Sequence, residues 1–529
     1  MSPQHSFFDP EFVDPKCLVE GTVPWLLARS STTLFPSWLF EGWEKPGRGR
    51  NPWSPRVLMA LLILRFHEEG MSRAAACRRA ARDSEWRAAL GLAFGERTPD
   101  ESSVRRFEKF MTRRHPVAGI ERFVVVHEHF VRLCIKHGVV RDPTYAMDST
   151  PMWAYGAVLD TVRLLGDGVR SLVKMWARLT DVPVEKLASE WRVRWVTAKS
   201  TKGAFGIDWK DSKARSEVIT ELAEGATAVV AGIVKSIHKA PAKMHKTLRR
   251  RGSDLMKVIA QDLEADDDGN LVVARRVAKD RLVSLTDPQS RHFRKTKSKR
   301  FTGFKLHLLG DVVSGLITSV SVTSGNVHDS AVAHRLLRRA QRVCDDVDRV
   351  FGDTAYGGAT LRHDVKRQFH VEVVAPPPPA NGKSGDGFTR ADFSIDFECN
   401  VATCPAGVAS SSSTTRFHST YGGQVPVVKW TQQECDVCPL REKCLPKNHR
   451  SKRLVLHPHE EELRLARRQW SDESFRASYR RRSECERLIN QVVRHGARHA
   501  RAWGLQAANT QGLLVVMRCN LGLLAKALG

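Results

Sequence analysis

The sequence predicts an α/β protein with a mixed sheet at its core. Runs of β-branched and other apolar residues, such as 301–313 and 315–325, are separated by turn residues in the way that strands are. Between such runs lie segments with helical periodicity and helix-capping residues. The 529 residues, 42% of them hydrophobic, are enough to bury more than one core. We therefore expect a sheet-centred core that carries additional units.

The first unit, residues 1–140, is predicted to be helical. Ser54 and Pro55 suit the N-cap and first turn of a helix that Gly70 ends, and Ser72 can cap the next helix. A third short helix follows a stretch of small and acidic residues near 100. Three short, arginine-rich helices are typical of a helix-turn-helix-like DNA-binding module. Any small basic helical bundle has the same pattern, so that interpretation also stays open.

The remaining elements define the other expected units. Strands are predicted at 144–150, 301–313, 315–325, 349–356 and 370–375. The region between the first two is mainly helical, and its tryptophans are more simply explained as packing residues than as base-stacking residues: Trp176, Trp191, Trp195 and Trp209. A proline-rich linker precedes a cysteine-rich segment, and a long helix is predicted at about 459–495. The predicted domains are a helical DNA-binding domain (1–140), an α/β core (141–155, 285–375 and 459–529), a helical insertion (156–284) and a Cys-rich insertion (376–458).

The charge of the chain indicates a polyanionic partner. Lys and Arg number 84 against 58 Asp and Glu, which gives a net charge of +26. The surplus is concentrated in runs such as 291–300, 246–252 and 479–487, which favours nucleic acid over an evenly solvated basic surface. We found no apolar window of the ~18 residues that a membrane helix needs and no secretory signal. A cytoplasmic protein without membrane contact is therefore expected.

Two aspartates are predicted at the ends of strands. Asp148 follows the apolar residues 145–147, and Asp353 follows the strand that begins near 349; a threonine lies shortly after each. Sites in open α/β sheets assemble at strand ends, so two such carboxylates can lie side by side. Each aspartate taken alone is more simply a turn or cap residue.

A third acid lies on the long predicted helix. Tyr479, Arg482 and Glu486 are spaced three and four residues apart, which places them on one face of an α-helix. A phenol, a guanidinium and a carboxylate together are unusual for pure packing. A solvated ion-pair face is an equally good explanation of these residues when they are considered alone.

The sequence resembles the DDE transposases of bacterial insertion sequences. The resemblance rests on three motifs in this order: AMDST at 146–150, GDTAY at 352–356, and the Tyr479, Arg482, Glu486 pattern. The resemblance is to the group with a tyrosine, arginine, glutamate, lysine signature, and it extends to segments 98–110, 287–311, 323–330 and 438–444. The position of the signature lysine is occupied by Val493, and Arg494 follows it directly. The resemblance implies an RNase H-like core, with the cysteine-bearing segment as an insertion.

The resemblance also implies roles for residues. Asp148, Asp353 and Glu486 would be catalytic and would bind Mg²⁺ or Mn²⁺ in a two-metal site, because these hard ions prefer carboxylate oxygens. The side chains expected to contact DNA phosphates are Tyr479, Arg482, Arg494, Lys305 and His307. For Lys305 and His307, an ordinary exposed strand face is an equally good explanation.

The implied activity is cleavage at terminal inverted repeats followed by strand transfer. The partners would be double-stranded DNA, both element ends and target, and a second copy of the chain, because two ends must be paired. A nucleoid-associated location would follow. Two alternatives stay open: a transposase-derived DNA-binding protein that does not cut, and an RNase H-like nuclease without strand transfer.

The clustered cysteines predict a second metal site. Cys404, Cys435, Cys438 and Cys444 supply four thiolates, enough for a tetrahedral structural Zn²⁺. The Cys435–Cys438 pair is the specific part of the pattern, whereas Cys399, His418 or His449 could replace one of the other ligands. A set of free thiols is the alternative.

Overall fold

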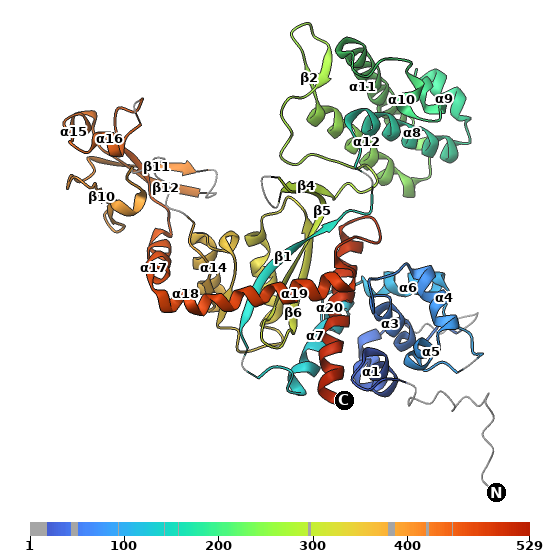
Figure 1. Cartoon of the computed structure of the whole chain (residues 1–529). Coiled ribbons are helices and arrows are strands. Elements are labelled where there is room, and N and C mark those ends of the chain that lie inside the picture. The colour runs from blue at the N-terminus through green and yellow to red at the C-terminus, as the bar shows by residue number, and fades with distance from the viewer. Residues whose placement is uncertain are drawn as a thin grey trace.

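A computed structural model describes residues 18–43, 51–93, 95–141, 143–156, 158–294, 298–378, 387–418, 423–446 and 448–529. At its centre is a six-stranded mixed sheet (Figure 1). The strands are β1 (Tyr145–Trp153), β4 (Arg291–Arg294), β5 (Arg300–Asp311), β6 (Ile317–Ser324), β7 (Arg349–Phe351) and β8 (Glu372–Val374). Their order is β4–β5–β1–β7–β8, and β6 also pairs with β5. β5 is antiparallel to β1, β4 and β6, whereas β1, β7 and β8 are parallel.

Asp148 lies inside β1 and not at its end, which corrects the sequence prediction. β1 pairs with β5 over its whole length, from Tyr145 opposite Asp311 to Trp153 opposite Gly303. It pairs with β7 only at Tyr145 and Ala146. Asp148 is therefore just beyond the point where the neighbouring strand stops. The predicted strand at 349–356 is likewise shorter than expected, because β7 ends at Phe351 and a 3₁₀ turn, η7 (Thr354–Tyr356), follows Asp353.

Helices cover both faces of the sheet. On one face α20 (Leu505–Leu528) packs closely against Leu306 and Val322, since a side chain at Gly512 would meet both. On the other face lies α13 (Ala333–Ala340), whose Leu336 carbonyl accepts a hydrogen bond of 2.9 Å from Ser319 Oγ. The alternation of these residues follows the two-residue period of a strand. α14 (Ala359–Phe369) packs against β8.

By length and composition α20 could cross a membrane, which the sequence analysis did not foresee. Its most apolar window is 67% buried within the protein. In this structure α20 is a core helix.

The N-terminal helices are α1 (Val23–Arg29), α2 (Ser31–Leu34), α3 (Pro55–Leu64), α4 (Arg73–Arg82), α5 (Ser84–Leu90), α6 (Glu101–Met111) and α7 (Arg122–Lys136), with the 3₁₀ turn η3 (Ser37–Phe40). Ser72 caps α4, as predicted, by accepting a hydrogen bond from the Ala75 amide. The sequence predicted one helix after Ser72, but this helix is divided at Asp83, which caps α5. The apolar side chains of this region and of the sheet form one continuous core. The separate domain 1–140 remains a prediction.

Two further units have small cores of their own. The helical one contains α8 (Thr161–Thr180), α9 (Val184–Glu190), α10 (Thr201–Ala204), α11 (Ser212–Lys235), α12 (Ala242–Asp262), η4 (Arg194–Thr197), η5 (Ile237–Lys239) and the hairpin β2 (Leu263–Ala265) and β3 (Leu271–Val273). The packing role of the four tryptophans is confirmed: Trp176 and Trp195 are buried, and Trp191 and Trp209 are partly buried against the same core.

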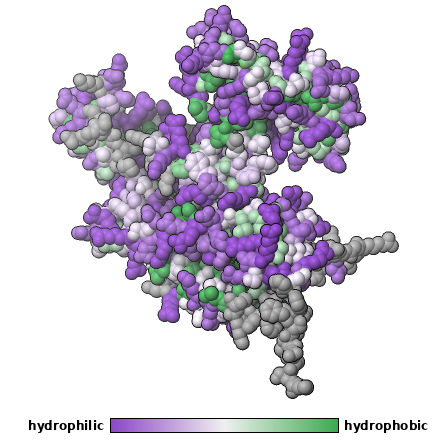
Figure 2. All heavy atoms as spheres, turned by 45° about the vertical axis from the view of Figure 1, so that its right-hand side comes forward, coloured by the Kyte–Doolittle hydropathy of each residue, from purple (hydrophilic) through white to green (hydrophobic). Residues whose placement is uncertain are grey.

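The cysteine-rich unit contains β9 (Ser394–Asp396), β10 (Val401–Thr403), β11 (Ser412–His418), β12 (Gly423–Lys429), β13 (Arg453–Val455), α15 (Gln432–Asp436), α16 (Arg441–Cys444) and η8 (Arg390–Asp392). Most of the linker predicted before it, 379–386, lies outside the described residues, as does 295–297 of the basic run 291–300. Figure 1 shows the helical and cysteine-rich units standing away from the sheet on different sides. Hydrophilic side chains dominate the face seen in Figure 2.

The long helix predicted at 459–495 is a series of shorter helices. They are α17 (Glu460–Ser471), α18 (Glu473–Tyr479), the 3₁₀ turn η9 (Arg480–Glu484), α19 (Cys485–Val492) and the π turn η10 (Val493–Ala497). Asp472 ends α17 and caps α18 by accepting hydrogen bonds from the Ser474 and Phe475 amides. The break occurs because aspartate competes for backbone amides in this way.

Candidate functional site

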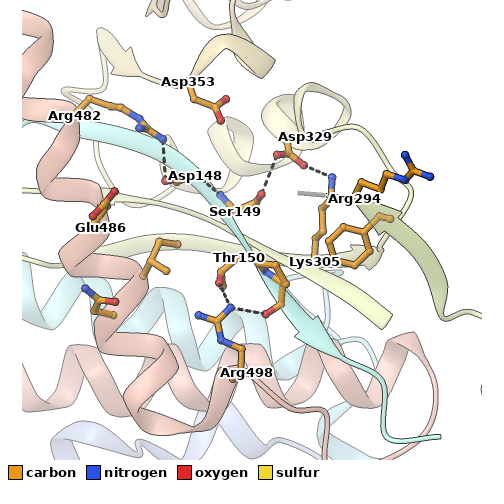
Figure 3. A pocket seen from close by; sticks show the side chains of 14 residues that line it. Asp148, Ser149, Thr150, Arg294, Lys305, Asp329, Asp353, Arg482, Glu486 and Arg498 are labelled. Carbon is orange, nitrogen blue, oxygen red and sulfur yellow. Dashed lines mark hydrogen bonds and ion pairs between the residues drawn. The ribbon is translucent and has the colours of Figure 1, made fainter. Parts of the chain in front are cut away.

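Asp148, Asp353 and Glu486, the three acids predicted from sequence, line one cavity of about 550 Å³ beside β1 (Figure 3). They come from three separate segments: the middle of β1, the loop after β7, and the first turn of α19. Basic and polar side chains complete the lining. These include Arg482, Lys305, Asp329, Asn490, Arg294 and Arg498.

Arg482 forms an ion pair with one of the acids. Its Nη2 donates to Asp148 Oδ2 at 3.0 Å, and the two side chains are 22% and 16% exposed. Burial acts to lower the pKa of Arg482, but the negative charges of Asp148 and Asp353 raise it overall, so the guanidinium stays charged. Tyr479 donates its hydroxyl hydrogen to the carbonyl of Gly352 at 2.9 Å. This contact fixes the residue before Asp353.

The side chains beneath the acids are buried. Tyr356 and Cys485 are fully buried there, and the Tyr356 hydroxyl has no hydrogen-bond partner among the described residues. Burial, and then the nearby carboxylates, raise the pKa of Cys485 to about 12 and that of Tyr356 well above its usual value. Both groups therefore remain neutral. This buried layer is of low polarity, which strengthens the interaction of the acids with nearby positive charges.

Lys305 and Asp329 form the opposite wall. Lys305 Nζ donates to Asp329 Oδ1 at 2.8 Å and to the Val327 carbonyl at 3.0 Å, while Ser149 Oγ donates to Asp329 Oδ2 at 2.9 Å. Burial acts to raise the pKa of Asp329, but Lys305 and Ser149 lower it overall. Asp329 begins the 3₁₀ turn η6 (Asp329–Val332) and was not predicted as a site residue. The position of Asp329 shortly after the predicted strand 315–325 could have indicated that it is a site residue.

His307 does not line the cavity. It is fully buried, its Nε2 lies 2.8 Å from Thr323 Oγ1, and burial lowers its pKa to about 4. The alternation of residues along the strand predicted His307 beside Lys305 on an accessible strand face. Lys305 and His307 do share that face, but Asp329 and α13 cover His307. Ser321 lies opposite His307 on β6 and accepts a hydrogen bond from Arg335 of α13. In this conformation His307 is therefore not accessible to DNA.

Arg498, and not Arg494, lines the cavity together with Arg482 and Arg294. Arg494 is exposed and does not line it. Arg498 Nη1 lies 3.1 Å from Thr150 Oγ1 and 3.4 Å from the Pro151 carbonyl. The chain turns sharply between the two arginines at Gly496, which has φ 95° and packs against the Glu69 backbone. A straight helix continued from Glu486 does not predict that Arg498 lies in the cavity, because the chain turns at Gly496.

The acids have the chemistry of a divalent-metal site, but not yet its geometry. Carboxylate oxygens suit a hard ion. Among the described residues, no group of three or more His, Cys, Asp or Glu side chains is close enough to hold a metal. At Asp148 the positive charge is supplied by Arg482.

The predicted thiolate ligands likewise have the chemistry of a metal site but not its geometry. After burial, the nearby thiols of Cys404, Cys435 and Cys438 raise the pKa of Cys444, so the four cysteines are neighbours. In the described part of the chain they do not form a closed tetrahedral set.

Two protein-family models match the chain. One, described as a transposase DDE domain, matches residues 403–525, which include Glu486, Arg482 and Arg498 of the cavity. The other, described as a transposase domain (DUF772), matches residues 24–110, the region from α1 to α6. Searches of curated proteins and of solved structures each gave no match. Transposase models thus match both the N-terminal helices and the segment with the last acid, and the two matches support a DDE transposase of an insertion sequence.

Proposed function

We propose that this transposase binds the terminal inverted repeats of its element, cuts the DNA there and joins the released 3′ end to target DNA. The observation that carries the proposal is the cavity in which Asp148, Asp353 and Glu486 meet Arg482 and Arg498. The sheet order and the parallel β1, β7 and β8 support an RNase H-like core.

DDE transposases use divalent metal ions, and the three acids fit such ions by ligand type. When bound, Mg²⁺ or Mn²⁺ would supply charge stabilisation and an activated oxygen nucleophile. Arg482 and Arg498 would hold the scissile phosphate by charge-assisted hydrogen bonds from two sides of β1. Arg482 would exchange its contact with Asp148 for one with phosphate, which frees Asp148 as a ligand. Tyr479 would keep the Asp353 loop in place through Gly352.

The partners would be element ends and target DNA, both double-stranded. We propose that the helices from α1 to α6 recognise the terminal repeat, because several of them carry exposed arginines, such as Arg78 and Arg105. A homodimer would pair the two ends. This activity would locate the protein at the nucleoid, in the cytoplasm.

The test is to incubate the full chain with a labelled terminal-repeat duplex, a target plasmid and Mg²⁺ or Mn²⁺, beside Asp148→Asn. We expect wild type to give nicked and joined products and Asp148→Asn to lose cleavage at least about a hundred-fold, because a metal ligand worth several kcal/mol is removed. Phe417→Ala, an exposed residue on β11, is a matched control that should cut normally. Binding without cleavage by wild type would identify a non-catalytic DNA-binding protein. Cleavage without joined product would identify a nuclease.

We also propose that Cys404, Cys435, Cys438 and Cys444 bind one structural Zn²⁺, for which the support is their proximity around Cys444. Zinc binding would draw the thiolates together and stabilise a unit with a small core. Metal analysis of the purified chain should find about one zinc per chain. Absence of zinc from folded protein prepared with zinc in the medium would refute this assignment.

A further inference from the structure

Three aromatic rings form a row that begins in the carboxylate cavity. Phe293 lines the cavity and lies directly opposite Phe301 across β4 and β5. Their ring centroids are 5.5 Å apart and the planes are inclined by 21°. Trp153, at the end of β1, continues the row with its centroid 4.8 Å from that of Phe301. All three rings are partly exposed, unlike the core aromatics Trp86 and Phe107.

This aromatic row shares a sheet face with Lys305. Along β1 the side chains of Ser149, Pro151 and Trp153 alternate onto one face, and Lys305 is paired directly with Pro151. Lys305 Nζ lies 5.5 Å from the centroid of the Phe293 ring. The opposite face carries Leu306, which packs against α20. The row therefore leads away from the cavity on the face that α20 does not cover.

Two exposed rings lie beyond the row. Tyr155 and Trp503 are 55% and 59% exposed, and their centroids are 5.6 Å apart at 66°. The Trp153 amide donates to the Arg498 carbonyl at 2.8 Å, and the Ala500 amide donates to the Trp153 carbonyl at 2.9 Å. These bonds fix the chain that leads from Arg498 to Trp503 alongside the end of β1. The pair is thus attached to the same two segments that line the cavity.

Basic side chains accompany the rings. Arg294 and Arg498 line the cavity, and Arg300 and Arg501 are exposed close to the row and to Trp503 in sequence. Accessible rings among guanidinium groups are the surface that binds single-stranded nucleic acid, because rings stack on bases and cations contact the backbone. Paired bases within a duplex are stacked on one another and do not offer their faces.

We propose that the aromatic row, together with Tyr155 and Trp503, binds unpaired nucleotides next to the phosphodiester that is cut. The inference rests on the proposed function, since that function places DNA in the cavity. It adds a substrate preference: DNA with unpaired nucleotides beside the cleavage site binds more tightly than fully paired DNA of the same sequence.

The test uses the full chain carrying Asp148→Asn, so that binding is measured without cleavage. One probe is a terminal-repeat duplex whose flank beside the cut site is an unpaired thymidine tract with one 2-aminopurine; the other has the same sequence fully paired. We expect tighter binding and quenched fluorescence with the unpaired probe. Adding Tyr155→Ala and Trp503→Ala should reduce its affinity about ten-fold and restore the fluorescence, while the affinity for the paired probe stays unchanged.

Two further variants keep the test decisive. Trp503→Phe retains a ring and should keep most of the preference, whereas Phe417→Ala removes a ring that is 66% exposed on β11 and should change nothing. Equal binding of both probes, or a preference that survives loss of both rings in a protein with an unchanged circular dichroism spectrum, overturns the inference. Cleavage of both duplexes by wild type is scored separately, so failure of the proposed activity is recognised independently of failure of stacking.

Discussion

Arg498 and Arg494 follow Glu486 on the same stretch of chain, yet only Arg498 lines the carboxylate cavity. We therefore expect Arg498→Ala to slow single-turnover cleavage by about ten- to a hundred-fold, the value of one lost charge-assisted hydrogen bond to phosphate. Arg494→Ala is the matched control and should cut within about two-fold of wild type. Rates are measured on a labelled terminal-repeat duplex at saturating protein.

Replacing the scissile phosphate by a neutral methylphosphonate tests whether the Arg498 contact is direct. In binding assays the substitution should weaken wild type and have much less effect on Arg498→Ala. The assignment fails if Arg494→Ala is the slower enzyme, or if both proteins respond equally to the neutral phosphate.

At the residue scale, sequence reasoning was most successful for side chains in short motifs. Asp148, Asp353, Glu486 and Arg482 were all expected in one site, and all line one cavity. Arg498 and Asp329 were missed because their positions depend on a kinked backbone and on a turn after a strand. The catalytic roles of these residues stay predictions.

At the scale of elements, the junction between α19 and the loop that carries Arg498 depends on Gly496. This residue has φ 95°, and a Cβ there would meet the Glu69 carbonyl. Gly496→Ala should destabilise the protein by about 1–3 kcal/mol through backbone strain and should slow cleavage by displacing Arg498. Urea unfolding and the cleavage assay measure the two effects.

Gly269→Ala is the comparison for this change. Gly269 also has positive φ, but a Cβ there meets no atom and the turn is remote from the cavity. It should cost stability without changing the cleavage rate. Equal effects of the two variants on cleavage would show that Gly496 does not position Arg498.

The contact between the start of α7 and α20 should make stability depend on pH. Glu121 accepts a hydrogen bond of 3.1 Å from Gln506 Nε2, and burial raises its pKa to about 7 although Arg339 opposes the shift. Because the folded pKa exceeds the unfolded value of 4.5, stability should fall as pH rises from about 4.5 to about 7. Glu121→Gln should remove this part of the pH dependence, measured as the difference in Tm between about pH 5 and 8. An unchanged difference would contradict the assignment.

Elements with strong local signals were predicted best. The hairpin of β5 and β6 and the Ser72 cap of α4 depend on nearby residues, whereas strand lengths depend on partners far away in sequence. β1 continues to Trp153 because β5 supplies hydrogen bonds over that whole length. No local pattern at 144–150 contains that information.

At the scale of the whole molecule, the net charge of +26 should dominate the affinity for DNA. We expect the affinity for a terminal-repeat duplex to fall about a thousand-fold between roughly 50 and 200 mM salt, because neutralised phosphates release counterions. Fluorescence anisotropy across a salt series gives the slope. A nearly flat dependence would mean that few phosphates are contacted and would contradict a role for the basic surface.

The division into four domains stays a prediction, and the connection between the N-terminal helices and the sheet was not foreseen. The N-terminal helices and the sheet share one core because α7 packs against α20. That contact joins segments nearly 400 residues apart. The residue pattern of neither segment predicts it.

The position of α20 has a consequence for how the protein is made. β1 emerges from the ribosome long before α20, yet α20 covers the apolar face of the sheet to which β1 belongs. Until α20 is synthesised, that face has no covering and Glu486 has no completed sheet to dock against. With the roles proposed for the N-terminal helices and the cavity, chains that stop short of α20 should bind DNA without cleaving it.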